Sequence, residues 1–127
     1  MRERYSSGSS WEEVFGFSRA VQVDDTLYVS KTGALGPDGT IVATDVAGQT
    51  RVILEKITRV LEEAGFALAD VVQSRMYLTQ LTHWRQAAEV HGAFFGDIRP
   101  AFTLLHVLPF AEPQMLVGIE VVACRNR

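Results

Sequence analysis

The order of helical and strand-like segments constrains this chain most. The expected order is two paired strands, a short third strand, a helix, a strand, a second helix and two closing strands. They are expected at residues 15–23, 27–31, 40–43, 46–64, 70–79, 83–95, 102–108 and 115–124. Helices between strands of one sheet require crossover connections, which place both helices on the same face. The sequence therefore predicts an α+β fold with a single sheet and one open face.

The signals for the two helices are strongest at their ends. Thr44 or Asp45 can cap the start of the first helix, and Gly65 is well placed to end it in the left-handed conformation. Thr82 can cap the second helix, which Gly96 ends. Between these limits apolar residues recur at helical spacing, so each helix has one face suited to packing on a sheet.

The closing strand carries the first candidate for chemistry. Residues 115–124 read Met-Leu-Val-Gly-Ile-Glu-Val-Val-Ala-Cys, and alternation places Glu120 beside Gly118 and Val122 on one face. A carboxylate in an apolar strand must be paired, hydrogen-bonded, protonated or next to a wet cavity. Glu120 is therefore a candidate general acid or base, or else a member of a structural ion pair. Gly118 leaves a gap beside it for a ligand atom or a water molecule.

The strand at 70–79 has an unusually mixed face. Alternation groups Val71, Gln73, Arg75 and Tyr77, a set too polar for a monomer core yet partly apolar. This face suits contact with a second subunit, although a plain solvent-exposed face explains it equally well. In the second strand the same rule places Lys31 with the apolar residues at 27 and 29.

Composition limits the class of protein. The 127 residues suit a single domain, in which residues 1–12 form a loose, serine-rich segment. The net charge of −3 and the absence of a basic patch beyond Arg2 and Arg4 argue against nucleic-acid binding. One cysteine, Cys124, excludes an intrachain disulfide and favours the cytoplasm. We expect no membrane segment, since no apolar run is long enough to cross a bilayer.

Metal, phosphate and nucleophile motifs are missing from the sequence. His83, His91 and His106 have no metal-ligand spacing, and no Lys-Ser or Lys-Thr follows the glycines at 33–39. Ser30 ends a strand without the turn of a nucleophile elbow. We therefore expect no metal and no cofactor.

A series of short segments nevertheless resembles the YjgF/RidA, or reactive-intermediate deaminase, family. These are Gly-Phe-Ser-Arg-Ala at 16–20, Tyr-Val-Ser at 28–30, Gln-Thr at 49–50, Leu-Glu-Glu-Ala-Gly at 61–65, Asp-Val-Val at 70–72, Arg-Pro-Ala-Phe-Thr at 99–103 and Ile-Glu-Val-Val-Ala at 119–123. Each is weak, but their common order and spacing are specific. The resemblance implies a chorismate-mutase-like fold and a homotrimer with a central barrel and small-molecule pockets between subunits.

The resemblance also implies an activity. The best-known members hydrolyse enamines and imines to 2-oxo acids and ammonia without a cofactor. By position, Glu120 matches the glutamate that positions or activates water, and Ser30 matches a pocket serine. Thr103 matches the residue after the arginine that holds the substrate carboxylate.

The chain departs from the family pattern at several of these positions. Phe102 replaces the arginine, Lys31 and Thr32 replace the glycine and glutamine after the serine, Phe17 replaces a tyrosine, and Ala88 and His91 replace an asparagine and a tyrosine. An aromatic ring cannot make the bidentate contact of an arginine with a carboxylate. Either the substrate lacks that carboxylate, or another cation holds it, for which Arg19 and Arg99 are the candidates. Phe17 and Phe102 favour a more apolar ligand.

Three functions remain open. The first is an enamine or imine deaminase or related hydrolase, in which Glu120 orients water. The second is a trimeric ligand-binding protein in which Glu120 is only a hydrogen-bond anchor. The third is an endoribonuclease or translation inhibitor, a function that the acidic net charge disfavours.

Overall fold

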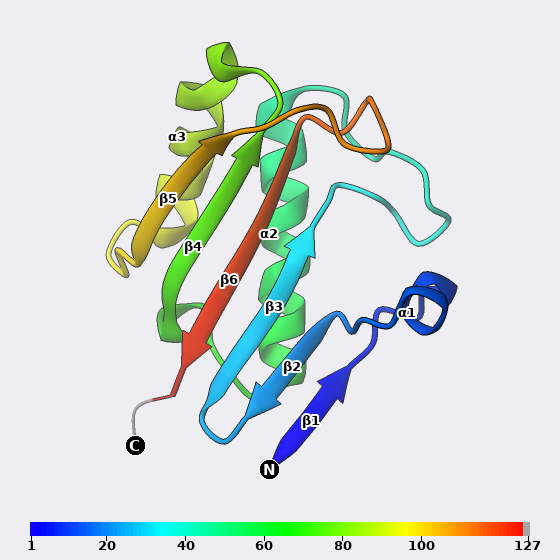
Figure 1. Cartoon of the computed structure of the whole chain (residues 1–127). Coiled ribbons are helices and arrows are strands. Elements are labelled where there is room, and N and C mark those ends of the chain that lie inside the picture. Colours follow the sequence, from blue (N-terminus) through cyan, green and yellow to red (C-terminus); the bar gives the residue numbers. More distant parts are fainter. Residues whose placement is uncertain (126–127) are drawn as a thin grey trace.

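A computed structural model, which describes residues 1–125, shows one mixed sheet covered by helices on one face (Figure 1). The strands are β1 (Arg2–Tyr5), β2 (Ala20–Val23), β3 (Thr26–Thr32), β4 (Val71–Leu78), β5 (Ala101–His106) and β6 (Val117–Cys124). The helices are α1 (Ser10–Phe15), α2 (Val46–Glu63) and α3 (Trp84–Phe95), with 3-10 turns η1 (Leu68–Asp70) and η2 (Leu81–His83). No helix within residues 1–125 is long and apolar enough to cross a membrane.

The sheet has the strand order β1-β2-β3-β6-β4-β5. Only β4 and β5 are parallel, and every other neighbouring pair is antiparallel. A parallel pair needs a crossover, which α3 supplies between β4 and β5. The helices α2 and α3 lie behind the sheet in Figure 1, so the predicted single sheet with two helices on one face is confirmed.

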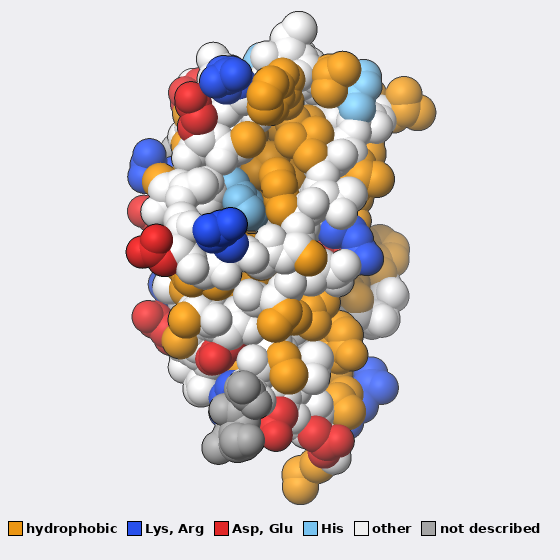
Figure 2. Space-filling model, turned by 90° about the vertical axis from the view of Figure 1, so that its left-hand side faces the viewer, with side chains coloured by type: hydrophobic (Ala, Val, Ile, Leu, Met, Phe, Trp, Pro, Cys, Tyr) orange, Lys and Arg blue, Asp and Glu red, His pale blue; other side chains and the backbone are white. Residues whose placement is uncertain are grey.

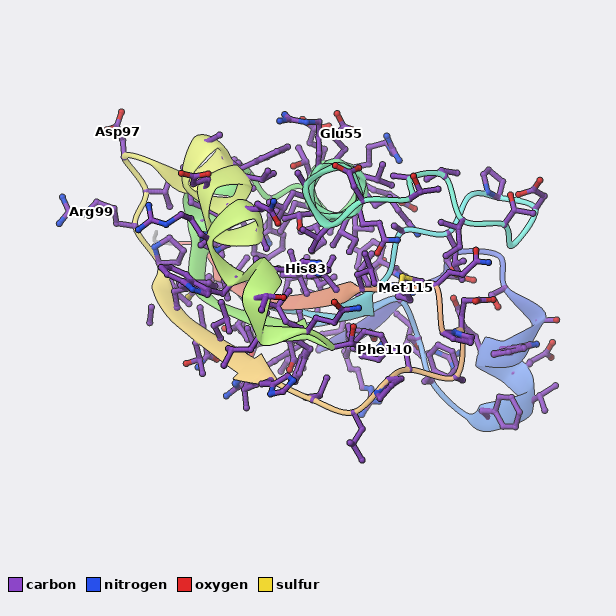
Figure 3. The ribbon with its side chains drawn as sticks, turned by 90° about the horizontal axis from the view of Figure 1, so that it is seen from above. Glu55, His83, Asp97, Arg99, Phe110 and Met115 are labelled. Carbon is purple, nitrogen blue, oxygen red and sulfur yellow. The ribbon has the colours of Figure 1, made fainter. Side chains whose placement is uncertain are left out.

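The core lies between the sheet and α2. One stripe of α2 is fully buried, as the helical spacing predicted, and it packs on the inward side chains of the central strands: Ile53, Leu54, Ile57 and Leu61 against Leu27, Met76, Val117 and Ile119. The predicted left-handed residue at the end of this helix is confirmed, since Gly65 has a φ of 81°. Neither α2 nor α3 lies on the opposite face of the sheet, which is called the open face below (Figure 3).

The start of the chain corrects the sequence analysis. Residues 1–12 were expected to be loose, but β1 pairs with β2 in four-residue register and α1 follows it. The helix α1 also occupies part of the region predicted to be extended from residue 15. Ser9 caps α1 and Gly16 ends it with a φ of 75°, so this serine-rich segment holds a helix start as well as a strand.

Three other expectations about the elements were wrong. Residues 40–43 form no strand, since Ile41 makes only an isolated bridge to Leu35. Thr82 lies inside η2, and α3 begins after His83 instead. In β4 a bulge between Val71 and Gln73 turns Val71 into the core and leaves Val72 half exposed.

Candidate functional site

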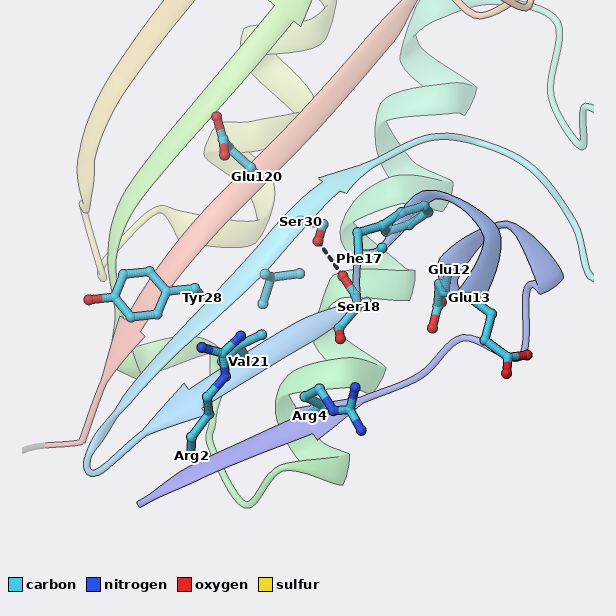
Figure 4. Close-up of a pocket in the computed structure, with 12 residues that line it drawn as sticks. Arg2, Arg4, Glu12, Glu13, Phe17, Ser18, Val21, Tyr28, Ser30 and Glu120 are labelled. Atoms are coloured by element: carbon cyan, nitrogen blue, oxygen red, sulfur yellow. Dashed lines mark hydrogen bonds between the residues drawn. The ribbon is translucent and has the colours of Figure 1, made fainter.

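A groove of about 580 Å³ lies on the open face of the sheet, between β1, α1 and β6 (Figure 4). Three of the predicted site residues line it: Glu120, Ser30 and Phe17. Its other lining residues include Arg2, Arg4, Glu12, Glu13 and Tyr28. The groove therefore joins the predicted carboxylate and serine to two arginines from a strand that the sequence analysis had taken for a loose segment.

Glu120 is held by two side chains of β4. Tyr77 donates a hydrogen bond to Glu120 Oε1, and Arg75 Nη1 lies 3.8 Å from the same oxygen. The pairing register explains both contacts, because Arg75 is opposite Glu120 and Tyr77 is opposite Gly118 on the open face. The hydrogen bond to Glu120, together with burial, raises the pKa of Tyr77, so this phenol stays a donor at neutral pH.

The surroundings of Glu120 differ from the sequence prediction in one respect. The apolar neighbours of Glu120 on its own strand would leave little room for water, but its side chain keeps 31% of its exposure. Its neighbours on the strand are apolar as predicted, while the neighbouring strand supplies a phenol and a guanidinium. Since both partners meet Oε1, the second oxygen, Oε2, is not needed for these contacts and can accept a proton or a hydrogen bond.

Ser30 is tied to the backbone. Its hydroxyl donates to the carbonyl of Ser18 over 2.6 Å, and its amide donates to the carbonyl of Arg19 over 3.0 Å. With its proton engaged in this way, Ser30 presents only acceptor lone pairs to the groove. This geometry suits a residue that binds a ligand better than a nucleophile, which would need an adjacent base.

Lys31 lies on the open face, whereas the alternation had placed it with the buried residues. The pairing of β3 with β6 shifts between Val29 and Thr32, and this bulge turns the Lys31 side chain outward. Its stem runs over Gly118, where the lysine Cγ and Cδ lie 3.0 Å from the place a Cβ would take. The gap predicted beside Glu120 is therefore filled by lysine methylenes.

Arg19 does not share the groove with Phe17. Residues 17–19 precede β2, so strict alternation does not apply to them, and Arg19 donates to buried Thr32 Oγ1 over 2.6 Å. Burial lowers the pKa of Arg19, an effect that the charge of Glu12 opposes. Arg19 acts as an internal cross-link between the start of β2 and the end of β3.

Phe102 and His91 lie on the helix side of the sheet, at the edge formed by β5. Phe102 stacks on His91 with ring centroids 4.2 Å apart, and His91 Nε2 lies 3.0 Å from Ser74 Oγ. Burial lowers the pKa of His91 to about 4, so the ring is neutral at pH 7. Figure 2 shows the molecule from the side of the β5 edge, where hydrophobic side chains gather in a patch.

The remaining two predicted residues lie apart from one another. Thr103 is opposite Arg75 in the parallel pair β4–β5, and its side chain belongs to the open face. Arg99 lies in the turn between α3 and β5, in a left-handed conformation with a φ of 55° (Figure 3). Within one chain, the structure thus separates the Glu120 groove from the Phe102–His91 pair by the thickness of the sheet.

Sequence reasoning missed the role of four residues. Arg2 and Arg4 were noted only as a basic pair in a loose segment, and Arg75 and Tyr77 only as members of a mixed face. The signal that could have found the second pair is the shared face of β4 and β6, once the two strands are taken as neighbours. Within residues 1–125 no group of three His, Cys, Asp or Glu could hold a metal ion.

Comparison with known proteins places the fold and the sequence in one family. The family model described as Endoribonuclease L-PSP matches residues 9–125. The uncharacterised protein SCO2049 of Streptomyces coelicolor is 34% identical over 97% of this chain and 92% of its own length. The RutC family protein PH0854 of Pyrococcus horikoshii is 29% identical over 99% of this chain and 100% of its own.

Solved structures agree with this assignment. The crystal structure of Rv2704 from Mycobacterium tuberculosis, described as a member of the YjgF/YER057c/UK114 family, superposes with a TM-score of 0.89. The two chains share 39% identity, over 98% of this chain and 100% of the other. A Rid protein of Yersinia pestis, YyfA, has a TM-score of 0.86 at 26% identity, over 98% of this chain and 100% of that one. The chain therefore belongs to the YjgF/RidA family, to which the Endoribonuclease L-PSP and RutC proteins also belong.

Proposed function

We propose that this protein is a cofactor-independent hydrolase of enamines or imines, with Glu120 as the group that orients water and moves the proton. The observation that carries the proposal is the fixed position of Glu120. Tyr77 and Arg75 hold Oε1 of Glu120. Glu120 and Ser30 both line a groove of about 580 Å³. A fixed carboxylate with one oxygen free suits general acid–base chemistry.

The reaction balances with this one carboxylate. Glu120 takes a proton from water as its oxygen attacks the imine carbon, and the C=N π electrons move to nitrogen. The carboxylic acid then returns the proton to that nitrogen. This gives a carbinolamine. Glu120 then takes the hydroxyl proton and delivers it to the amino nitrogen, and the C–N bond breaks as the carbonyl forms, so that an imine and one water give a ketone and ammonia. An enamine enters the same path after protonation at carbon.

We also propose that the protein works as a homotrimer with its pockets between subunits. Large apolar side chains on the open face and at the β5 edge support this, since they are 37–86% exposed in the single chain: Tyr28, Val72, Leu105 and Leu108. A second copy could cover them. Light scattering should give three times the 14.1 kDa chain mass, and a stable monomer at micromolar concentration would overturn the trimer.

The substrate preference should differ from that of the best-known members. Phe102 occupies the position of the carboxylate-binding arginine, and it stacks on a neutral histidine at a β-sheet edge. We therefore expect weak turnover of the enamines formed from serine and threonine, and better turnover of larger apolar ones. Phe102→Arg, assayed beside the wild type, tests whether a positive charge at this position restores the smaller substrates.

The deciding experiment is ammonia release from enamines generated in situ from several amino acids. We expect release with at least one substrate, and loss of it in Glu120→Gln. Ligand binding without ammonia release would indicate a binding protein instead. Cleavage of an RNA oligonucleotide that depends on Glu120, without any ammonia release, would replace the proposal by the endoribonuclease function named in the family description.

A further inference from the structure

We propose that Lys31 is the binding site for an anionic group, such as a carboxylate, on the ligand of the Glu120 groove. This inference rests on the proposed function, because it specifies the substrate class of the same site. The sequence analysis predicted Lys31 as a substrate-binding residue, but for the substrate carboxylate it named only Arg19 and Arg99. Four features of the structure carry it: the bulge, the glycine under the lysine stem, the aromatic ring beneath its amine, and the absence of a protein partner.

The first two features place the side chain. The bulge between Val29 and Thr32 turns Lys31 onto the open face, and Gly118 provides the space in which its stem lies. A side chain at position 118 would have to push the methylenes away, since its Cβ would be 3.0 Å from two of them. Lys31 follows groove residue Ser30 in sequence, and its stem covers the residue two before Glu120. The stem of Lys31 therefore starts next to a residue that lines the groove and runs toward the end of β6 that precedes Glu120.

The third feature is the ring of Phe110. Lys31 Nζ lies 4.3 Å from the centroid of this ring, which is a cation–π contact. Such a contact holds the ammonium in place but, unlike a hydrogen-bond acceptor, does not occupy its N–H groups. Figure 3 shows Phe110 on the side of the sheet away from α2, the side of the groove. The stem and the head of the lysine are thus both fixed by apolar surfaces, which leaves its donors available.

The fourth feature is the lack of a protein anion for this ammonium. Among the described residues Lys31 makes no hydrogen bond and no ion pair, although it feels the charges of Arg19 and Glu120. Glu120 already forms an ion pair with Arg75 and accepts a hydrogen bond from Tyr77, so its partners are side chains of β4 and not Lys31. Desolvation of the lysine head lowers the pKa of Lys31, with a further contribution from the charge of Arg19, and an anionic ligand would oppose both effects.

The other cations near the site are less suited to this role. Arg19 is committed to Thr32, and Lys56 Nζ donates to the carbonyls of Gly33 and Leu35 over 2.8 and 2.9 Å. Arg99 lies in the turn beyond α3. Arg2 and Arg4 also line the groove, from the edge strand β1, but within residues 1–125 neither of them lies over an aromatic ring as Lys31 does. Lys31 therefore combines free donors with an ammonium that is held in place, on a stem that covers Gly118, two residues before Glu120.

The test uses two probes of the same shape, 2-oxobutanoate and its uncharged amide. The chain has two lysines, so NMR of protein labelled at lysine gives one signal for Lys31 and one for Lys56 as an internal reference. We expect 2-oxobutanoate to move the Lys31 signal and not the Lys56 signal. Lys31→Met should weaken the binding of 2-oxobutanoate about five- to tenfold and leave the binding of the amide unchanged. Lys31→Arg should keep most of the affinity for 2-oxobutanoate.

Gly118→Ala and Arg85→Met complete the design. The first should displace the lysine stem and lower the affinity for 2-oxobutanoate in the same direction as Lys31→Met. The second removes another cation that lies over a ring, that of Trp84, and should change nothing. Equal weakening of both probes by Lys31→Met, or none, would overturn the inference. A Glu120→Gln variant with full turnover would overturn the proposed hydrolase while leaving this binding result intact.

Discussion

Neighbouring positions on β4 show how differently the two faces of the sheet treat polar groups. Ser74 points to the helices, where it is fully buried and meets the neutral ring of His91. Arg75 points to the open face, where it is 42% exposed and pairs with Glu120. On the helix side the buried polar groups are neutral and bonded to each other, whereas on the open face charged groups are paired and remain partly exposed to water.

The comparison assigns different roles to the two clusters. A carboxylate that is exposed by about a third can exchange protons with a ligand or water, so the open face suits chemistry. A neutral histidine stacked on Phe102 suits apolar recognition and stability.

The largest effect is expected for Glu120→Gln. This change keeps the shape and the hydrogen bond from Tyr77 but removes proton transfer, so turnover should fall on the order of 100-fold or more. Thermal melts should show an intact fold. If Glu120 is instead only an anchor, Glu120→Gln stays active and Glu120→Ala lowers the melting temperature, and the catalytic role is lost.

The second prediction concerns acid stability and His91. Its pKa is about 4 when folded, below the value of about 6.5 for an unperturbed histidine, so the unfolded chain binds more protons between these values. The free energy of unfolding should therefore decrease as the pH is lowered through this window, by about 2 kcal/mol from pH 7 to pH 5. Urea unfolding at both pH values measures this contribution.

The control for His91 is a variant that cannot titrate there. His91→Phe should remove the contribution of this histidine to the pH dependence of stability and leave that of the other titratable groups. The variant should therefore lose less free energy of unfolding between pH 7 and pH 5 than the wild type does. Identical curves for the two proteins would show that His91 does not favour its neutral form in the fold.

The third prediction concerns Tyr77. Tyr77→Phe removes the hydrogen bond to Glu120 Oε1 with little change of shape, at a cost of about 1 kcal/mol. The rate of turnover should fall about fivefold, with a shift in its pH profile, while KM stays nearly constant. A variant that changes KM alone would mean that Tyr77 contacts the ligand rather than positions the carboxylate.

The smallest effect is expected for Arg75→Met. The ion pair with Glu120 is 3.8 Å long and exposed to solvent, so its loss should cost roughly 0.5 kcal/mol of stability and weaken further at high salt. Denaturant titrations at low and high salt measure this difference. A loss of several kcal/mol would show that Glu120 is desolvated in the working assembly, as a subunit contact would produce.

The sequence by itself determined the order of the elements from β2 onward, apart from the strand wrongly expected at residues 40–43. It also determined the face of β6 that carries Glu120 and the helix stripe that packs on the sheet. These follow from local periodicity, which is a property of consecutive residues. The short family segments added the fold class and the position of Ser30. The sequence did not reveal the place of Arg2 and Arg4 in the groove, because a serine-rich start gives no local sign that it will pair with β2.

Only the tertiary structure decided what each site residue meets. The bulge that turns Lys31 outward depends on pairing with β6, and the contacts of Glu120 depend on which strand lies next to it. Phe102 faces His91 because β5 is added parallel to β4 after the α3 crossover. Strand pairing joins residues far apart in sequence, and one extra residue in a strand reverses which face a side chain takes, so periodicity alone cannot fix either outcome.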